Sequence, residues 1–184
     1  MRDIAKNLVA YPRRDNGVNS IIEDIWNAGV LFTYVPHFEK TYTDGASFWH
    51  GANPVLAYTA RYDRIDNFWF TVAHELGHIL LHEGKETSEF VDSLDNLKPD
   101  DDLETEADDF AKRVLRIPEI LRAFEGIRRV SRKQVDNCAY LLGLHPGVVV
   151  GALQRAGRLN YQSLNALKEP VRELLPGSFG QNAT

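Results

Sequence analysis

The segment from His74 to His78, His-Glu-Leu-Gly-His, has the residue types and the spacing of a catalytic metal site. On a helix, residues four apart lie one turn above each other on the same face, so both imidazoles can bind one ion. Histidine nitrogens bind zinc at about 2.0–2.1 Å. Glu75 points to a neighbouring part of the helix surface, where its carboxylate can act as a general base on a metal-activated water molecule. The pattern predicts His74 and His78 as metal ligands and Glu75 as the catalytic base of a metallopeptidase.

The apolar residues around this motif support the metal interpretation. In the segment FTVAHELGHILLH, residues 70–82, apolar side chains occupy more than one face of a helix, which predicts a buried helix. Two histidines and a glutamate buried without partners would destabilise such a helix by several kcal/mol. A bound ion gives these residues a physical reason to be there, whereas a chance occurrence of three motif residues does not.

A catalytic zinc site needs a third protein ligand, and three residues are candidates. His82 lies about 12 Å along the same helix from His74, so it cannot share an ion with both motif histidines. His50 precedes the motif in an expected loop, at a spacing that does not point to the metal. Glu104 begins the segment ETEADDFA on a second expected helix, and we predict that it completes a His2Glu site. Asp108, one turn further on, is predicted to accept a hydrogen bond from the outer nitrogen of a ligand histidine.

Glu106 is the alternative to Glu104, because both belong to the same acidic run. Residues two apart on a helix point in directions about 200° apart, so only one of the two can be the ligand. Glu104 and Asp108 share a helical face with the apolar Ala107 and Ala111, which favours Glu104. The competing interpretation is that both glutamates face water.

These residues must be positioned by a fold that the sequence predicts to be α+β. A small, mostly antiparallel sheet is expected to pack on the zincin-like HExxH helix and on the helix of the third ligand, followed by a helical C-terminal region. The expected elements are a helix at 20–29, a strand at 30–35, a loop or bent hairpin at 36–54, a strand at 55–60, a helix at about 66–82 with Asn67 as a possible cap, a mobile or solvated connection at 84–103, and a helix at 103–116. The expected domains are a zinc peptidase domain at 1–118, a helical region packed on it at 119–175, and a flexible tail at 176–184.

Residues 131–157 have the pattern of a helix–turn–helix, with Gly143 at the turn and Pro146 in the first turn of the second helix. His145 is expected to be a cap or a surface residue. As a DNA reader, the second helix would enter the major groove, but GVVVGAL offers almost no side chain that can read bases. The favoured interpretation is a structural hairpin whose apolar residues form core, and DNA binding is the alternative.

The composition is that of a globular protein, with 43% hydrophobic residues and a net charge of −5. The charges are uneven, since residues 84–109 hold eleven Asp/Glu against two Lys, and residues 111–158 hold ten Lys/Arg against three Asp/Glu. A uniformly basic nucleic-acid binder is excluded, but a local basic surface is not. The single Cys138 cannot form an internal disulfide, and no signal peptide or apolar run of about 18 residues is seen. We therefore expect a cytoplasmic protein that does not contact a membrane.

HELGHILLH followed by ETEADDFAKRVLRIP resembles the two motif blocks of the ImmA/IrrE family of metallo-endopeptidases. The resemblance extends over about residues 20–155. It implies one zinc ion per chain, with Glu104 as the third ligand. It also implies that the substrate is a regulatory protein, such as a repressor or an antitoxin-like protein of phage, mobile-element or stress-response circuits. The strand before the motif, with Val55, Leu56, Ala57 and Tyr58, would be an edge strand to which an extended substrate adds.

Two features leave parts of this resemblance open. The segment after the third-ligand helix is often a hydrophobic LLMP in the family, whereas here it contains Arg116. No residue can be assigned as the donor that stabilises the oxyanion, and Tyr58, Tyr140 and several arginines are candidates.

Two functions remain in competition. The first is a zinc-dependent endopeptidase that cleaves a regulatory protein through metal-activated water. The second is a non-proteolytic regulatory module that binds a repressor, an antitoxin-like partner or DNA. The basic stretch at 111–158 and the helix–turn–helix pattern motivate this alternative.

Overall fold

The computed structural model describes residue 4 and residues 8–14, 16–36, 43–82 and 101–176. Residues 84–100 of the expected connection at 84–103 and residues 177–184 of the expected tail at 176–184 therefore lie outside the described residues, whereas residues 101–103 begin a helix. The described chain folds into three strands, β1 (Leu31–Tyr34), β2 (Gly45–His50) and β3 (Asn53–Tyr58), and into the helices α2 (Gly17–Asn27), α3 (Ile65–Leu81), α4 (Asp101–Val114), α5 (Ile117–Ala123), α6 (Arg132–Leu142) and α7 (Pro146–Arg155). Short 3-10 helices lie at Leu8–Ala10, Asn165–Leu167 and Arg172–Leu174. The predicted α+β class is confirmed.

β3 is the central strand of the sheet, whose order is β1-β3-β2. It pairs in parallel with β1 and antiparallel with β2, so the sheet is mixed. The prediction that Val55 to Tyr58 form an edge strand is wrong. The segment 36–54, expected to be a loop or a bent hairpin, contains β2, which occupies the second side of β3. Within the described sheet, the free edge on this side belongs to β2.

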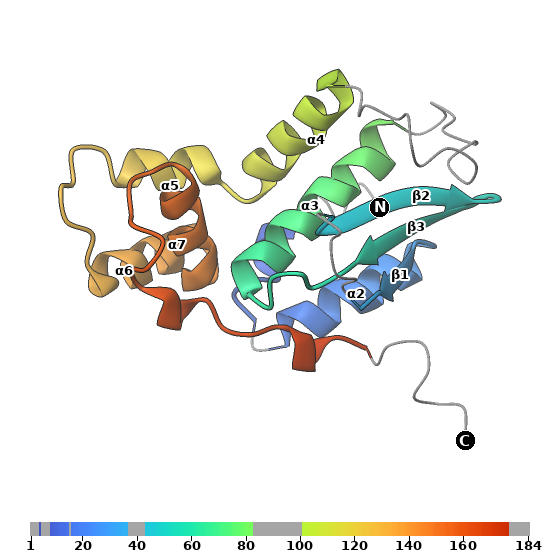
Figure 1. Cartoon of the computed structure of the whole chain (residues 1–184), viewed down its shortest axis with the longest axis horizontal. Coiled ribbons are helices and arrows are strands. Elements are labelled where there is room, and N and C mark those ends of the chain that lie inside the picture. Colours follow the sequence, from blue (N-terminus) through green and yellow to red (C-terminus); the bar gives the residue numbers. More distant parts are fainter. Residues whose placement is uncertain (1–3, 5–7, 15, 37–42, 83–100, 177–184) are drawn as a thin grey trace.

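α3 packs against β2, β3, α4 and α7, and it lies at the centre of the molecule (Figure 1). Four of its large apolar side chains are at most 1% exposed, namely Phe68, Trp69, Val72 and Leu76. The prediction of Asn67 as the cap is wrong, because α3 begins two residues earlier, at Ile65. The Ile65 amide donates to the carbonyl of Glu169 at 2.8 Å, so a distant segment satisfies one of the free amides at the start of the helix.

α6 and α7 form a helical hairpin with local signals at its ends. The Ser131 hydroxyl and the Gln134 side chain form a capping box at the start of α6. Gly143 ends α6 with a φ of +72°, and the Nδ1 atom of His145 accepts from the Gly147 amide at 3.0 Å, which confirms His145 as a cap. The buried residues of α7 are Gly147, Val148, Val149, Val150, Ala152, Leu153 and Gln154. This burial supports the interpretation of a structural hairpin, because these side chains are not available to read bases.

The described residues form two hydrophobic clusters. The first surrounds α2, α3 and the sheet, the second lies among α5, α6 and α7, and Ile117 packs against both. The domain boundary at residue 118 remains a prediction. None of the helices in the described part of the chain is long and apolar enough to cross a lipid bilayer.

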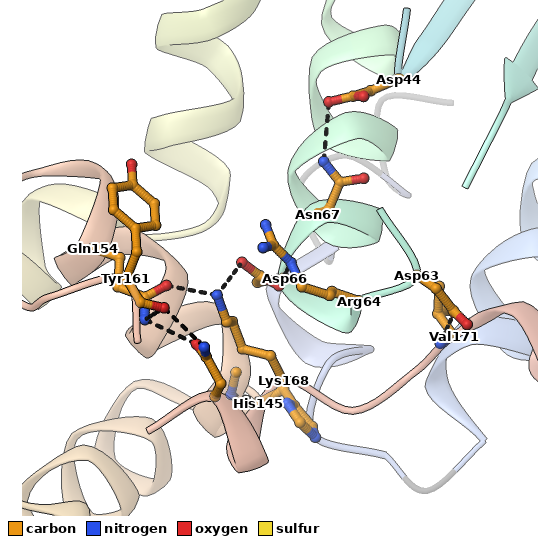
Figure 2. A network of polar contacts seen from close by, with 12 residues as sticks. Asp44, Asp63, Arg64, Asp66, Asn67, His145, Gln154, Tyr161, Lys168 and Val171 are labelled. Carbon is orange, nitrogen blue, oxygen red and sulfur yellow. Dashed lines mark hydrogen bonds and ion pairs between the residues drawn. The ribbon is translucent and has the colours of Figure 1, made fainter. Parts of the chain in front are cut away.

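Buried polar contacts connect the C-terminal segment to the start of α3 (Figure 2). The side chain of Lys168 is 2% exposed, its Nζ atom donates to Gln154 Oε1 at 2.6 Å, and it lies 3.9 Å from Asp66 Oδ2. Asp63 Oδ1 accepts from the amides of Val171 and Arg172, each at 2.8 Å. Since Asp63 and Asp66 flank the first residue of α3 while Gln154 belongs to α7, these contacts hold α7 against α3.

Candidate active site

His74, His78 and Glu104 converge where α3 and α4 pack against each other. The Nε2 atoms of the two histidines are 3.0 Å apart. The two carboxylate oxygens of Glu104 lie 3.3 Å from His74 Nε2 and 3.4 Å from His78 Nε2. Among the described residues, these three side chains form the group that could hold a metal ion. The fold thus brings the three predicted ligands together.

The donor set fits a zinc ion. Two ligands bound at 2.0–2.1 Å in a tetrahedral site lie about 3.3 Å apart, and these ligand atoms are separated by 3.0, 3.3 and 3.4 Å. Two histidine nitrogens and one carboxylate are a common ligand set of catalytic zinc, which keeps its fourth position open. Burial and the neighbouring His74 lower the pKa of His78, which favours the neutral ring that metal binding requires.

Gly77 brings the third ligand within reach by letting α4 come close to α3. A Cβ atom at this position would lie 3.1 Å from the Cα of Ala107 and 3.2 Å from the ring of Phe110. The small residues Gly77 and Ala107 therefore face each other at the contact between the helices. Since Glu104 lies about one turn before Ala107 on α4, this close approach carries its carboxylate to the histidines.

Asp108 occupies the position predicted for it. Its Oδ1 atom lies 3.0 Å from His74 Nδ1, on the side of the ring away from His78. The Nζ atom of Lys112 lies 3.8 Å from the other carboxylate oxygen of Asp108. A carboxylate only accepts hydrogen bonds, so this contact keeps the ring proton of His74 on Nδ1 and leaves Nε2 free for a metal.

Glu75 is buried beside the two motif histidines and points toward β2. It is 5% exposed, and it accepts a hydrogen bond from the side chain of Ser47. A Cβ atom on Gly45 would lie 3.1 Å from Glu75 Oε1 and 2.5 Å from Thr71 Cγ2, so the strand fits here because residue 45 has no side chain. Burial raises the pKa of Glu75 to about 7, although the Ser47 hydrogen bond and His74 act in the opposite direction. A carboxyl group that titrates near neutral pH is suited to accepting and returning a proton.

Sequence reasoning missed Ser47 and Gly45 as parts of the site. Both belong to β2, in a segment whose glycine, proline and polar residues predicted a loop or bent hairpin. The sequence of this strand, GASFWH, does not alternate apolar and polar residues, so no periodic signal identified it.

The other two ligand candidates lie outside the metal group. His50 is the exposed last residue of β2. His82 is 8% exposed, with its Nδ1 atom 3.1 Å from His78 Nδ1 and its Nε2 atom 3.0 Å from Glu106 Oε2. Glu106 therefore contacts a histidine, although neither residue belongs to the three-ligand group.

The two tyrosine candidates for the oxyanion donor are not brought to the metal group either. Tyr58 is buried, and its hydroxyl donates to Asn67 Oδ1 at 3.5 Å. Tyr140 lies on α6 with 67% of its surface exposed, and the guanidinium of Arg13 lies over its ring. Arg116 is exposed between α4 and α5, so its departure from the family pattern leaves the core intact.

A pocket of about 210 Å³ lies one turn of α3 away from the ligands, between α3, α4, α5 and α7. Phe70 forms part of its wall and also stacks on His74, with ring centroids 6.4 Å apart. The guanidinium of Arg155 lies 3.9 Å above the ring of Phe70, and Lys112 lines the pocket as well. The pocket therefore combines apolar walls with two cations and one anion, Asp66, and adjoins a predicted metal ligand.

Comparison with known proteins agrees with this geometry. A family model described as the IrrE N-terminal-like domain of peptidase family M78 matches residues 27–144, which include every residue of the metal group and Glu75. No curated protein matches the chain. The match extends over more than half of the sequence and confirms the resemblance carried by the two motif blocks. The chain therefore belongs to the M78 peptidases, the family with the IrrE N-terminal-like domain.

Proposed function

We propose that this protein is a zinc-dependent endopeptidase that cleaves a regulatory protein, such as a repressor or an antitoxin-like protein. The observation that carries the proposal is the convergence of His74, His78 and Glu104 beside the buried carboxyl group of Glu75. A structural metal site would not need a buried general base next to its ligands. The membership in a peptidase family supports the same activity.

The residues of the site divide the chemistry among them. A zinc ion bound by the three ligands would supply the Lewis acidity that lowers the pKa of water to about 7. Glu75 would accept the proton of the attacking water and pass it to the leaving amine. The hydrogen bond from Ser47 orients the carboxylate for this transfer, and burial keeps its pKa near neutral pH. Asp108 holds the ring of His74 in the orientation that metal binding needs.

We infer that the substrate enters as an extended segment along β2. The described sheet leaves the outer edge of β2 unpaired, and this strand carries Ser47, which contacts the catalytic glutamate. Peptides commonly bind by adding a strand to such an edge, where backbone hydrogen bonds give affinity without demanding one sequence. We therefore propose that the substrate adds to the outer edge of β2, Gly45 to His50, and not to Val55 to Tyr58 of β3 as the sequence suggests.

The pocket beside Phe70 is suited to an apolar side chain of the substrate that has an acidic neighbour. Its walls are apolar, and its lining carries two cations, Lys112 and Arg155, against one anion, Asp66. The excess of ten Lys/Arg over three Asp/Glu in residues 111–158 favours an acidic segment in the same way. Replacing Ala152, which lines the pocket, with Phe should lower kcat/KM for the substrate and leave zinc binding unchanged.

The alternative of a non-proteolytic module is motivated by that same basic stretch. Its DNA-binding form loses support from the burial of α7, whose apolar side chains lie against α3, α5 and α6. Its protein-binding form predicts that regulation of a partner survives the loss of the general base.

The decisive experiment compares wild type, Glu75→Gln and His78→Ala. Wild type and Glu75→Gln should each contain one zinc ion per chain by elemental analysis, and His78→Ala should contain much less. Mass spectrometry of new protein N-termini in cells that express each form should then show cleavage products in wild type alone. Equal zinc content in all three proteins would contradict the proposed zinc site. Identical new N-termini in cells that express wild type and Glu75→Gln would contradict the proposed peptidase activity and favour the non-proteolytic binding module.

A further inference from the structure

Three histidines follow one another along one face of α3, at positions 74, 78 and 82. The first two belong to the metal group, while His82 stands at the end of the helix, where its amide donates to the His78 carbonyl at 3.0 Å. A histidine at a helix end usually extends into water, yet His82 is only 8% exposed. Its burial requires hydrogen-bond partners for both ring nitrogens, and the structure supplies them in His78 and Glu106.

The carboxylate of Glu106 sets the direction of the whole chain of hydrogen bonds. Ionised, it only accepts, so His82 must carry its ring proton on Nε2 to donate across the 3.0 Å contact. In the neutral ring of His82 the Nδ1 atom is then an acceptor, and His78 donates to it from Nδ1 across 3.1 Å. In the neutral ring of His78, this leaves Nε2 with a lone pair, directed at His74 Nε2 and Glu104.

Without this chain, His78 has a competing arrangement. Asp108 keeps the proton of His74 on Nδ1, so His74 Nε2 is an acceptor that lies 3.0 Å from His78 Nε2. A proton on His78 Nε2 would form a hydrogen bond there and block the nitrogen that a metal needs. In that arrangement His82 would donate to His78 and turn a lone pair toward the carboxylate of Glu106, which is repulsive. The Glu106 charge therefore selects the arrangement that can bind metal.

We propose that His82 and Glu106 are positioning residues that hold the His78 ring with Nε2 free for zinc, as Asp108 does for His74. The inference rests on the proposed zinc site. It gives a role to the third histidine of HELGHILLH and to the second glutamate of ETEADDFA, neither of which is a ligand. A carboxylate of α4 then orients each ligand histidine of α3. Asp108 contacts His74 directly, and Glu106 acts on His78 through His82.

Variants of His82 test this chain of hydrogen bonds through the zinc affinity, which is measured by competition with a chromogenic chelator. His82→Phe keeps a ring of similar size and removes both hydrogen bonds, so zinc binding should weaken about 10–100-fold. His82→Gln provides an amide oxygen that can accept from His78 and an amide nitrogen that can donate to Glu106. Its zinc affinity should lie closer to wild type than to His82→Phe.

A matched pair on α4 tests the carboxylate. Glu106→Ala removes the charge that fixes the chain and should weaken zinc binding, whereas Asp109→Ala removes a charge from the same helix and should leave it unchanged. Asp109 pairs with Lys112 at 3.1 Å, and its side chain is 64% exposed against 56% for Glu106. Because both side chains are exposed, both variants should fold as wild type does, which thermal unfolding of the metal-free proteins checks.

A second measurement uses the metal-free protein, so it depends on neither zinc nor activity. Nitrogen-15 NMR of the imidazoles should place the His78 proton on Nδ1 in wild type and in His82→Gln, and shift it to Nε2 in His82→Phe and Glu106→Ala. If wild type binds no zinc, the proposed function fails while this measurement still decides the inference. The inference is overturned if Glu106→Ala matches Asp109→Ala in zinc affinity and His78 keeps its Nδ1 proton in Glu106→Ala and His82→Phe.

Discussion

The α3–α4 pair and the α6–α7 hairpin are both built from two packed helices, but their stability has different sources. α6 begins with a capping box, and between the helices lie Gly143 with φ of +72° and the cap His145. At its start, α3 has no side-chain cap, and a carbonyl from the C-terminal segment binds its first amide. The hairpin thus has local signals that favour its own helices, whereas α3 depends on packing by the rest of the chain.

The residues at the two helix contacts differ in the same way. In the hairpin, apolar residues such as Val135, Val149 and Leu153 fill the contact. Between α3 and α4, Gly77 and Ala107 bring the backbones close, and polar groups such as His74 and Glu104 face each other at a partly exposed contact. The comparison indicates that the hairpin is a structural unit, whereas the contact between α3 and α4 carries the candidate active site. Variants in the two regions should therefore affect different measurements.

The largest expected effect is a loss of activity on substitution of Glu75, which belongs to the α3–α4 pair. Glu75→Gln removes the proposed general base and should lower the rate of cleavage by about 10²–10⁴-fold, measured on the substrate identified by its new N-terminus. Zinc content and thermal stability should stay near wild type. The control is Cys138→Ala in the hairpin, which should retain wild-type activity. A comparable loss of activity in Glu75→Gln and Cys138→Ala would contradict the assignment of the active site to the α3–α4 pair alone.

The next effect is on stability alone. Leu153 is buried at 0% exposure in the hairpin cluster, so Leu153→Ala should lower the free energy of unfolding by about 2–5 kcal/mol. Urea denaturation of the metal-free protein measures this change. Zinc affinity of the folded variant should remain that of wild type. A weakened zinc site in this variant would show that the hairpin also positions the ligands.

Gly77→Ala should lower both the stability and the zinc affinity, because Gly77 lies at the contact between α3 and α4. The added Cβ atom would lie 3.1 Å from the Ala107 Cα, so α4 must shift or strain, at about 1–3 kcal/mol of stability. The same shift should move Glu104 and weaken zinc binding, measured by chelator competition. Unchanged zinc affinity with reduced stability would mean that Glu104 adapts to a displaced helix.

The smallest expected effect concerns the cap of α6. Ser131→Ala removes the acceptor of the Gln134 amide and should lower the free energy of unfolding by about 1 kcal/mol. Thermal unfolding checks this value, and zinc content should not change. The exposed Lys133→Ala on the same helix is the control, and a similar loss there would argue against the cap as the cause.

The sequence by itself determined the parts of the site that depend on local geometry. Helical spacing alone places His74 and His78 on one face, because residues four apart on a helix are always neighbours. The same rule, applied to ETEADDFA, selected Glu104 over Glu106 and placed Asp108 one turn further on. The class of fold and the capped hairpin followed from patterns within short segments, and the family followed from the two motif blocks.

Only the tertiary structure decided which distant segments meet. β2 pairs with β3 and contacts Glu75 through Ser47, but no periodic signal marked it, so Ser47 was missed and β3 was taken for an edge. The contact of His82 with Glu106 joins residues 24 apart in sequence, which pattern reasoning could assign only to a helix end and an acidic surface. The physical reason is the same in each case. Local spacing fixes which side chains share a face, whereas the packing of one element on another determines what that face meets.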